Sequence, residues 1–256
     1  MLLRNLIGFR TIRWLACLPV GISLLSAGAA SGQSIEAART ALSEGRFVEA
    51  AEIGEALDTS AGYALAAEAL AIHGHYLAAE DAKAELLDRA MQMGQQAIRK
   101  DPDNPAAHLQ HAHAMGRYTQ AVGTLRVKRE YAGRVRAALE RALFLKPGLA
   151  EAHLSLGAWH AEAIRGGGFM ARVLFGASGS EARAHYNAAL ELAPDAKIVH
   201  AEYALGLLFL DRRRHLEEAR VLLERASELP SRDAHDRIVH DRVIANLAEL
   251  DIRTRR

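Results

Sequence analysis

The stretch that decides the fold is "ALFLKPGLAEAH", residues 142–153, because similar phrases occur twice more in the chain. They are "AIRKDPDNPAAH" at residues 97–108 and "ALELAPDAKIVH" at residues 189–200. In each phrase an alanine stands five residues before a proline, and a histidine stands six residues after it. Internal similarity of this kind is typical of repeat proteins, in which one small structural unit stacks on the next.

The prolines divide the rest of the chain in the same way. Because proline cannot continue a helix, a proline just past a helical pattern marks the end of that helix. Aromatic residues make up only 5% of the chain, and such a composition favours helices that pack closely through small side chains. The prolines beyond the first thirty residues are Pro102, Pro105, Pro147, Pro194 and Pro230.

These units resemble the tetratricopeptide repeat, a pair of antiparallel helices about 34 residues long. In that family a Leu-Gly pair lies in the first helix, small and large apolar residues alternate in the second, and a proline closes the unit. The matching residues from Ala150 are Leu156, Gly157, Ala182, Tyr186, Ala189 and Pro194. The matching residues from Lys197 are Tyr203, Ala204, Ala219, Leu223, Ala226 and Pro230.

The resemblance predicts an all-α solenoid of helical hairpins over residues 34–252. Its expected units are residues 34–58, 61–102, 105–147, 150–194 and 197–230. Apolar residues at helical spacing in residues 233–252 predict a C-terminal capping helix, which a stack of hairpins needs at its end.

The unit that closes at Pro194 is longer than the family norm and carries the insert "RGGGFMARVLFGASG", residues 165–179. With "LGAWHAE" before it and "EARAHYNAALELAP" after it, the insert resembles the regulator of microtubule dynamics protein family. The resemblance, carried by Leu156, Gly157, Trp159, Ala171, Leu174, Phe175, Gly176, Ala182, Tyr186 and Leu190, implies a tetratricopeptide-type fold. The predicted export signal described next is typical of a bacterial, exported relative.

Residues 1–30 have the features of a secretory signal peptide. Three arginines precede an uncharged apolar run from Trp14 to Ala30, and small residues offer cleavage after Ala29 or Gly32. An uncleaved membrane anchor is the alternative. Cleavage would remove Cys17, the only cysteine, and would place the mature protein in the periplasm or outside the cell.

The charge balance argues against nucleic acid as a partner. The whole chain has 32 basic and 31 acidic residues, and loss of three arginines with the signal leaves 29 against 31. A mature charge near −2 lacks the positive excess that binds phosphate backbones. We therefore expect no nucleic acid partner.

Neither metal binding nor catalysis has a clear motif. The recurring histidines, His108, His153 and His200, would lie in a file, but no carboxylate recurs with them at ligand spacing. A role in packing is favoured over a metal site. The chain also lacks zinc-protease, nucleophile-elbow and phosphate-loop motifs, so we expect no cofactor and no enzymatic activity.

The expected binding surface is the concave face, which the first helix of each tetratricopeptide unit lines. The family positions predict a mostly apolar groove that lacks the basic clamp of chaperone-binding members. The groove residues expected on this basis are Leu109, His113, Leu154, Ala158, Ala161, Ile198, Leu205 and Leu208. Such a surface suits a partner or ligand that covers it, although the stack could also fill the groove with its own side chains.

The insert offers a candidate lid for this groove, formed by Phe169, Met170, Leu174 and Phe175. The same residues could instead contact a membrane or pack on the neighbouring hairpin. We expect a non-catalytic extracytoplasmic scaffold that binds a protein partner, and an envelope complex is one setting for such a partner. The alternative is a carrier of a lipid or another apolar small molecule in the groove.

Overall fold

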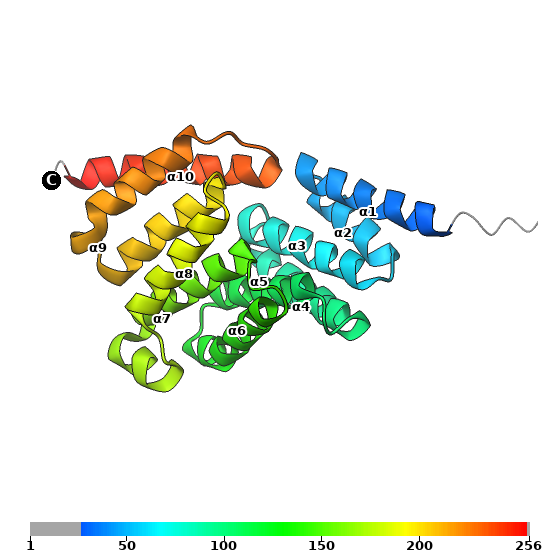
Figure 1. Cartoon of the computed structure of the whole chain (residues 1–256), viewed down its shortest axis with the longest axis horizontal. Helices are drawn as coiled ribbons and strands as arrows, with labels where there is room; N and C mark the ends of the chain where they lie inside the picture. Colours follow the sequence, from blue (N-terminus) through cyan, green and yellow to red (C-terminus); the bar gives the residue numbers. More distant parts are fainter. Residues whose placement is uncertain (1–26, 255–256) are drawn as a thin grey trace, which may run out of the picture.

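The computed structural model describes residues 27–254, and within them every element of regular secondary structure is a helix. Ten helices form a curved stack (Figure 1). Their bounds are α1 Ala27–Glu44, α2 Phe47–Ala56, α3 Ser60–Tyr76, α4 Glu80–Lys100, α5 Pro105–Val122, α6 Leu125–Leu145, α7 Ala150–Phe175, α8 Gly179–Leu192, α9 Lys197–Glu228 and α10 Ala234–Thr254. The predicted fold class, an all-α helical repeat solenoid, is confirmed. The predicted signal peptide lies almost entirely outside the described residues.

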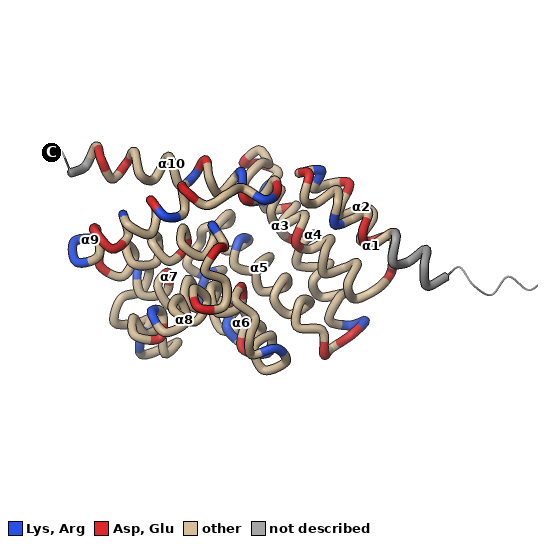
Figure 2. The backbone as a smooth tube through the Cα atoms, turned by 45° about the horizontal axis from the view of Figure 1, so that its top comes forward, with Lys and Arg blue, Asp and Glu red and all other residues tan. Residues whose placement is uncertain are grey.

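Two of the helices are interrupted. α7 breaks at Gly168, where φ is 49° and ψ is −126°, so residues 169–175 form a separate helical segment. α9 breaks at Asp211, whose backbone is extended, so its two halves form the last hairpin of the stack. Lys, Arg, Asp and Glu lie interspersed along the whole stack, as Figure 2 shows.

The repeated histidines contact the backbone at the start of a hairpin. In each phrase the imidazole Nε2 lies within hydrogen-bonding distance of the carbonyl oxygen of the proline six residues earlier. The distances are 2.8 Å from His108 to Pro102, 3.1 Å from His153 to Pro147, and 2.7 Å from His200 to Pro194. A carbonyl beyond a helix end needs a donor, and the imidazole N–H can supply one. The repeated phrase is therefore explained by the turn that it stabilises.

The core follows the small and large residues of the repeat. Tyr186 of α8 is 1% exposed, and its ring lies between α7 and α9. A Cβ placed on Gly157 would lie 2.8 Å from this ring, and one on Gly206 would lie 2.1 Å from the phenol oxygen. Tyr203 stacks on the same ring at 4.8 Å. Glycine at both positions is what lets three helices meet around one aromatic side chain.

The last helix, α10, does more than cover the end of the stack. It packs along α9, and its first turn reaches back to the turn between α1 and α2 (Figure 1). A Cβ on Gly45 in that turn would lie 3.0 Å from the Cβ of Ala234. α10 therefore links the two ends of the solenoid, and the inner helices α3, α5, α7 and α9 face the space beside it.

Candidate functional site

Tyr76, the last residue of α3, is the point at which three inner elements meet. The guanidinium carbon of Arg117, from α5, lies 5.5 Å from its ring centroid. That of Arg242, from α10, lies 5.0 Å away, and the ring of His235 lies 5.6 Å away. Each cation–π contact contributes about 0.5–1 kcal/mol at a partly exposed site. These contacts hold α10 over the inner face of the stack.

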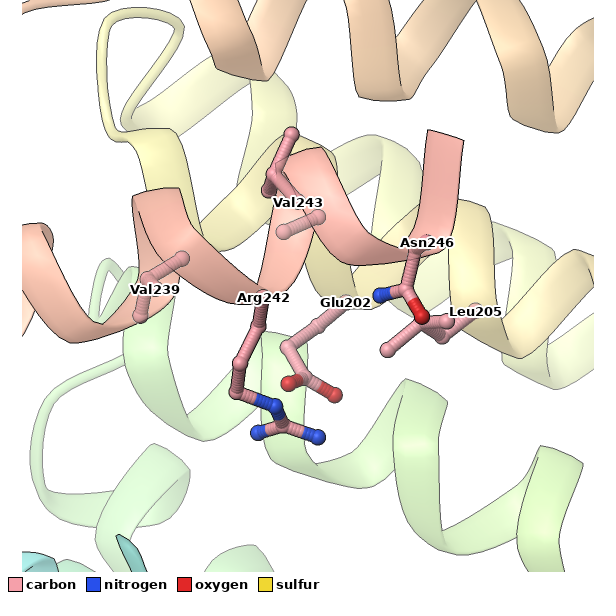
Figure 3. A pocket seen from close by; sticks show the side chains of 7 residues that line it. Glu202, Leu205, Val239, Arg242, Val243 and Asn246 are labelled. Carbon is pink, nitrogen blue, oxygen red and sulfur yellow. The ribbon is translucent and has the colours of Figure 1, made fainter. Parts of the chain in front are cut away.

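Two carboxyl groups on the inner helices accompany the arginines. Burial raises the pKa of Glu68 on α3 to about 7, and the charge of Arg117 opposes this shift only in part. Burial also raises the pKa of Glu202 on α9, against the attraction of Arg242 and Arg117. In Figure 3 the Glu202 and Arg242 side chains lie beside one another under α10. Near neutral pH, Glu68 therefore exists in both protonation states and can donate or accept a hydrogen bond.

The histidines around this point are held neutral. Burial and then the charge of Arg117 lower the pKa of His75 and of His113 to about 3. The same two causes lower the pKa of His235 to about 4. His113 Nε2 lies 2.7 Å from the Ser155 hydroxyl. We call this set the concave cluster, and it consists of Glu68, His75, Tyr76, His113, Arg117, Glu202, His235 and Arg242.

Neither arginine of the concave cluster has a carboxylate within ion-pairing distance among residues 27–254. Arg183 and Arg220, by contrast, bind Glu218 and Asp251 at 2.8 Å and 2.6 Å. A guanidinium presents five N–H donors in a fixed planar arrangement that matches a carboxylate. Arg117 and Arg242 are therefore free to bind an anionic group from outside this part of the chain.

One small pocket lies directly under α10. A pocket of about 10 Å³ lies between α9 and α10, lined by Glu202, Leu205, Arg242 and their neighbours (Figure 3). That volume holds about one water molecule. A ligand larger than water therefore cannot enter this pocket and would contact Glu202 and Arg242 from outside it. No group of three potential metal ligands occurs in the part of the chain that the structure describes.

The structure does not bring the expected groove residues together on one open apolar surface. Leu109, Leu154 and Ala161 are 1%, 6% and 0% exposed, because they pack between neighbouring helices. His113 belongs to the concave cluster and Leu205 lines the small pocket. The remaining expected residues, Ala158, Ile198 and Leu208, are partly buried against the C-terminal core. The inner face therefore differs from the expected apolar groove, and its prominent side chains are charged.

The candidate lid residues lie at the end of α7, away from α10 (Figure 1). Phe169, Met170 and Leu174 are 74%, 55% and 57% exposed, and Phe175 is partly buried. A separate cleft of about 740 Å³ lies beside them. It is lined by Ile164, Arg172, Gly179, Ser180, Arg183, Leu210, Asp211, Arg214, His215 and Glu218.

The main residues of the concave cluster were not expected from the repeat pattern, although the sequence contains a signal for two of them. Glu68 is the only charged residue of α3, "SAGYALAAEALAIHGHY", apart from its histidines. Glu202 is likewise the only acidic residue in the first half of α9. An isolated charge in a buried helix is costly unless it serves a purpose, so such positions are candidates for a site. No comparable signal identifies Tyr76, Arg117 or Arg242.

The comparisons with known proteins agree with this architecture. Residues 58–251 match the family model described as regulator of microtubule dynamics protein 1-3. Among solved structures, a thermophilic tetratricopeptide repeat protein from Thermus thermophilus is similar, with a TM-score of 0.59 and 17% sequence identity. The similarity covers 84% of this chain and 99% of that one. No curated protein matches the chain.

None of the described helices is long and apolar enough to cross a membrane. Tetratricopeptide-type folds typically serve as protein-interaction scaffolds and are typically non-catalytic. The family match covers most of the chain and includes the insert of residues 165–179. The chain belongs to the regulator of microtubule dynamics protein 1-3 family.

Proposed function

We propose that this protein is a non-catalytic scaffold that binds an acidic segment of a protein partner at the concave cluster. The observation that carries the proposal is the pair Arg117 and Arg242, which lie on one tyrosine and lack a carboxylate partner within residues 27–254. A partner carboxylate bound there would gain charge-assisted hydrogen bonds, which are stronger than neutral ones.

The surroundings of the two arginines support selective binding. The carboxyl groups of Glu68 and Glu202 partly offset the charge of the two arginines. An anionic segment is therefore bound only where its carboxylate meets the guanidinium donors and avoids the two glutamates. Neutral Glu68 can donate a hydrogen bond to the partner, whereas ionised Glu68 repels its carboxylate. The proposed binding is therefore favoured as the pH falls through the pKa of Glu68, about 7.

The alternative, a carrier of a lipid or apolar small molecule in the concave groove, is not favoured. The pocket under α10 has a volume of about 10 Å³, and a drug-sized ligand needs a site of about 300 Å³ or more. The side chains on the inner face are also largely charged.

The place of action is part of the proposal. The apolar run of residues 14–30 and the small residues after it support export, followed by cleavage after Ala29 or Gly32. The partner would then belong to the cell envelope or to the medium.

In-cell photo-cross-linking tests the proposal. A photoreactive amino acid replaces Glu151, whose charge acts on Glu68, or Gln95, which is exposed on the outer helix α4. We expect a discrete cross-linked protein from position 151 and none from position 95. Combining position 151 with R117A/R242A should lower the yield at least about tenfold, the effect of losing one charge-assisted contact.

The conservative variant R117K/R242K serves as the control, because lysine keeps the charge but not the planar donor arrangement. We expect it to retain part of the yield, with unchanged circular dichroism. Equal cross-linking from both positions, or no effect of the alanine variant, would refute partner binding at the concave cluster. A chain recovered from the cytoplasm with residues 1–30 intact would refute export.

A further inference from the structure

The segment after the break in α7 is an apolar protrusion with a fixed orientation. We call residues 169–175 the α7 tip. Its four outward side chains are Phe169, Met170, Val173 and Leu174, which are 74%, 55%, 61% and 57% exposed. A soluble surface rarely gathers this many large apolar side chains on one short turn without a binding role.

The inner side of the α7 tip packs against the rest of the protein, so its outward side chains stay exposed to solvent. Ala171 is 3% exposed, as is Ala177 just beyond the tip. Arg136 of α6 donates a hydrogen bond of 2.8 Å from Nη1 to the carbonyl oxygen of Phe175. The guanidinium of Arg136 also lies 5.4 Å from the centroid of the Trp159 ring. The α7 tip is therefore fastened to α6 and to the first part of α7.

The left-handed backbone of Gly168 directs the α7 tip. Its φ of 49° combined with ψ of −126° lies in a region that residues with a side chain rarely adopt. The helix therefore ends there, and the segment after it points away from the stack (Figure 1). Continuation of the helix would have placed the apolar side chains in a different direction.

Four arginines lie in the α7 tip, in the cleft beside it, or close to it along the chain. Arg172 belongs to the tip, and Arg214, just after the break in α9, lines the same cleft. Arg213, the residue before Arg214, is exposed. Arg165 comes just before the glycines of the insert, and its guanidinium carbon lies 4.0 Å from the centroid of the Phe209 ring. None of these four arginines has a carboxylate within ion-pairing distance in the part of the chain that is described. The cleft also contains two carboxylates. Asp211 accepts a hydrogen bond of 3.1 Å from the backbone N–H of Arg214, and Glu218 pairs with Arg183 at 2.8 Å.

We infer that the α7 tip docks on the surface of a lipid bilayer that contains anionic lipids. The outward side chains enter the boundary between headgroups and acyl chains, and the four arginines contact lipid phosphates. The α7 tip is a convex apolar turn. A fluid bilayer can close around such a shape, whereas a protein partner would need a matching apolar pocket. The surface is remote from the concave cluster, so the inference does not depend on the proposed function (Figure 1).

Vesicle binding by the full chain tests the inference. The chain carries Cys17→Ser together with either Met170→Cys or Gln95→Cys, and the new cysteine holds an environment-sensitive fluorophore. We expect a blue shift from position 170 with vesicles of phosphatidylcholine and phosphatidylglycerol, and none from position 95. Phosphatidylcholine alone should give a much weaker response, because the arginines contribute about a fivefold gain in affinity each on anionic lipid.

Substitutions separate the contribution of the apolar side chains to vesicle binding from that of the arginines. F169S/L174S should weaken sedimentation with anionic vesicles at least about tenfold at any ionic strength. R172E/R214E should weaken it at least about tenfold at low salt and less at high salt. The matched control is V48S/V221S, which changes exposed apolar side chains outside the α7 tip and should bind like the parent chain.

Two results would overturn the inference. One is equal vesicle binding by the parent chain and F169S/L174S, which would assign binding to another segment such as residues 1–30. The other is a label at position 170 that responds to proteins in a membrane-free extract but not to vesicles, which would make the α7 tip a protein-docking site. Unchanged urea midpoints of the variants would show that their folds are intact.

Discussion

The two parts of α7 are both rich in apolar residues, yet they occupy opposite environments. Leu154, Leu156 and Ala161 in the first part are at most 6% exposed, because α6 packs on one side of this part and α8 and α9 on the other. Phe169 and Val173 in the α7 tip are more than half exposed. The first part has small residues at its helix crossings, whereas the tip follows a backbone break that turns it away from the stack. Apolar content alone therefore does not distinguish a segment that stabilises the fold from one that is available to bind.

The largest expected effect concerns the Tyr186 ring, which packs the first part of α7 against α9. Tyr186→Ala removes a fully buried ring that contacts Gly157 and Gly206 and stacks on Tyr203. We expect the free energy of unfolding to fall by about 3–5 kcal/mol. Urea denaturation measures this loss of stability. Phe169→Ala, which removes an aromatic ring from the α7 tip, serves as the matched control. The tip variant should change stability by about 0.5 kcal/mol or less. Similar losses in both variants would remove the distinction between the two parts.

The second effect depends on pH and concerns His160, which is 3% exposed in the first part of α7. Its Nδ1 accepts a hydrogen bond of 3.2 Å from the backbone N–H of Ser178, and burial lowers its pKa from 6.5 to about 4. The unfolded chain therefore binds a proton at higher pH than the folded chain. Stability from this group is complete above about pH 6.5 and is lost as the pH falls toward 4.

We expect His160 to account for about 2–3 kcal/mol of the stability lost between pH 7 and pH 4, since each unit of pKa shift corresponds to about 1.4 kcal/mol. Urea midpoints across this range for the parent chain and His160→Gln measure the contribution. The variant should be less stable at pH 7 but should lose less on acidification. Parallel pH profiles would mean that His160 has the same pKa in the folded and the unfolded chain.

The smallest effect compares two glycines of the same helix. Gly157→Ala places a Cβ 2.8 Å from the Tyr186 ring, and we expect a loss of about 1–2 kcal/mol through overpacking. Gly166→Ala adds a Cβ with nothing within 4 Å, near the start of the insert. We expect a gain of about 0.5–1 kcal/mol there, because alanine favours the helix. Thermal denaturation compares the stability of the two variants with that of the parent chain. Changes in melting temperature of the same sign would contradict the difference in packing at the two glycines.

The sequence by itself determined the fold class and the family. Prolines and the repeated alanine and histidine positions act locally, through turns and helix crossings. Their effect can therefore be predicted from the sequence pattern alone. The insert of residues 165–179 identified the family because its glycines and apolar residues are contiguous. The expected scaffold function follows from the fold only in general terms.

Only the tertiary structure decided which side chains share the inner face. Tyr76, Arg117 and Arg242 are brought together by α10, whose return to the start of the stack depends on the summed curvature of every hairpin. Packing between neighbouring helices also buried Leu109 and Leu154, which the family positions placed on the concave face. Small changes in each crossing angle accumulate along a solenoid, so no single repeat contains this information. The direction of the α7 tip was likewise decided by one backbone conformation, that of Gly168, which a residue pattern does not specify.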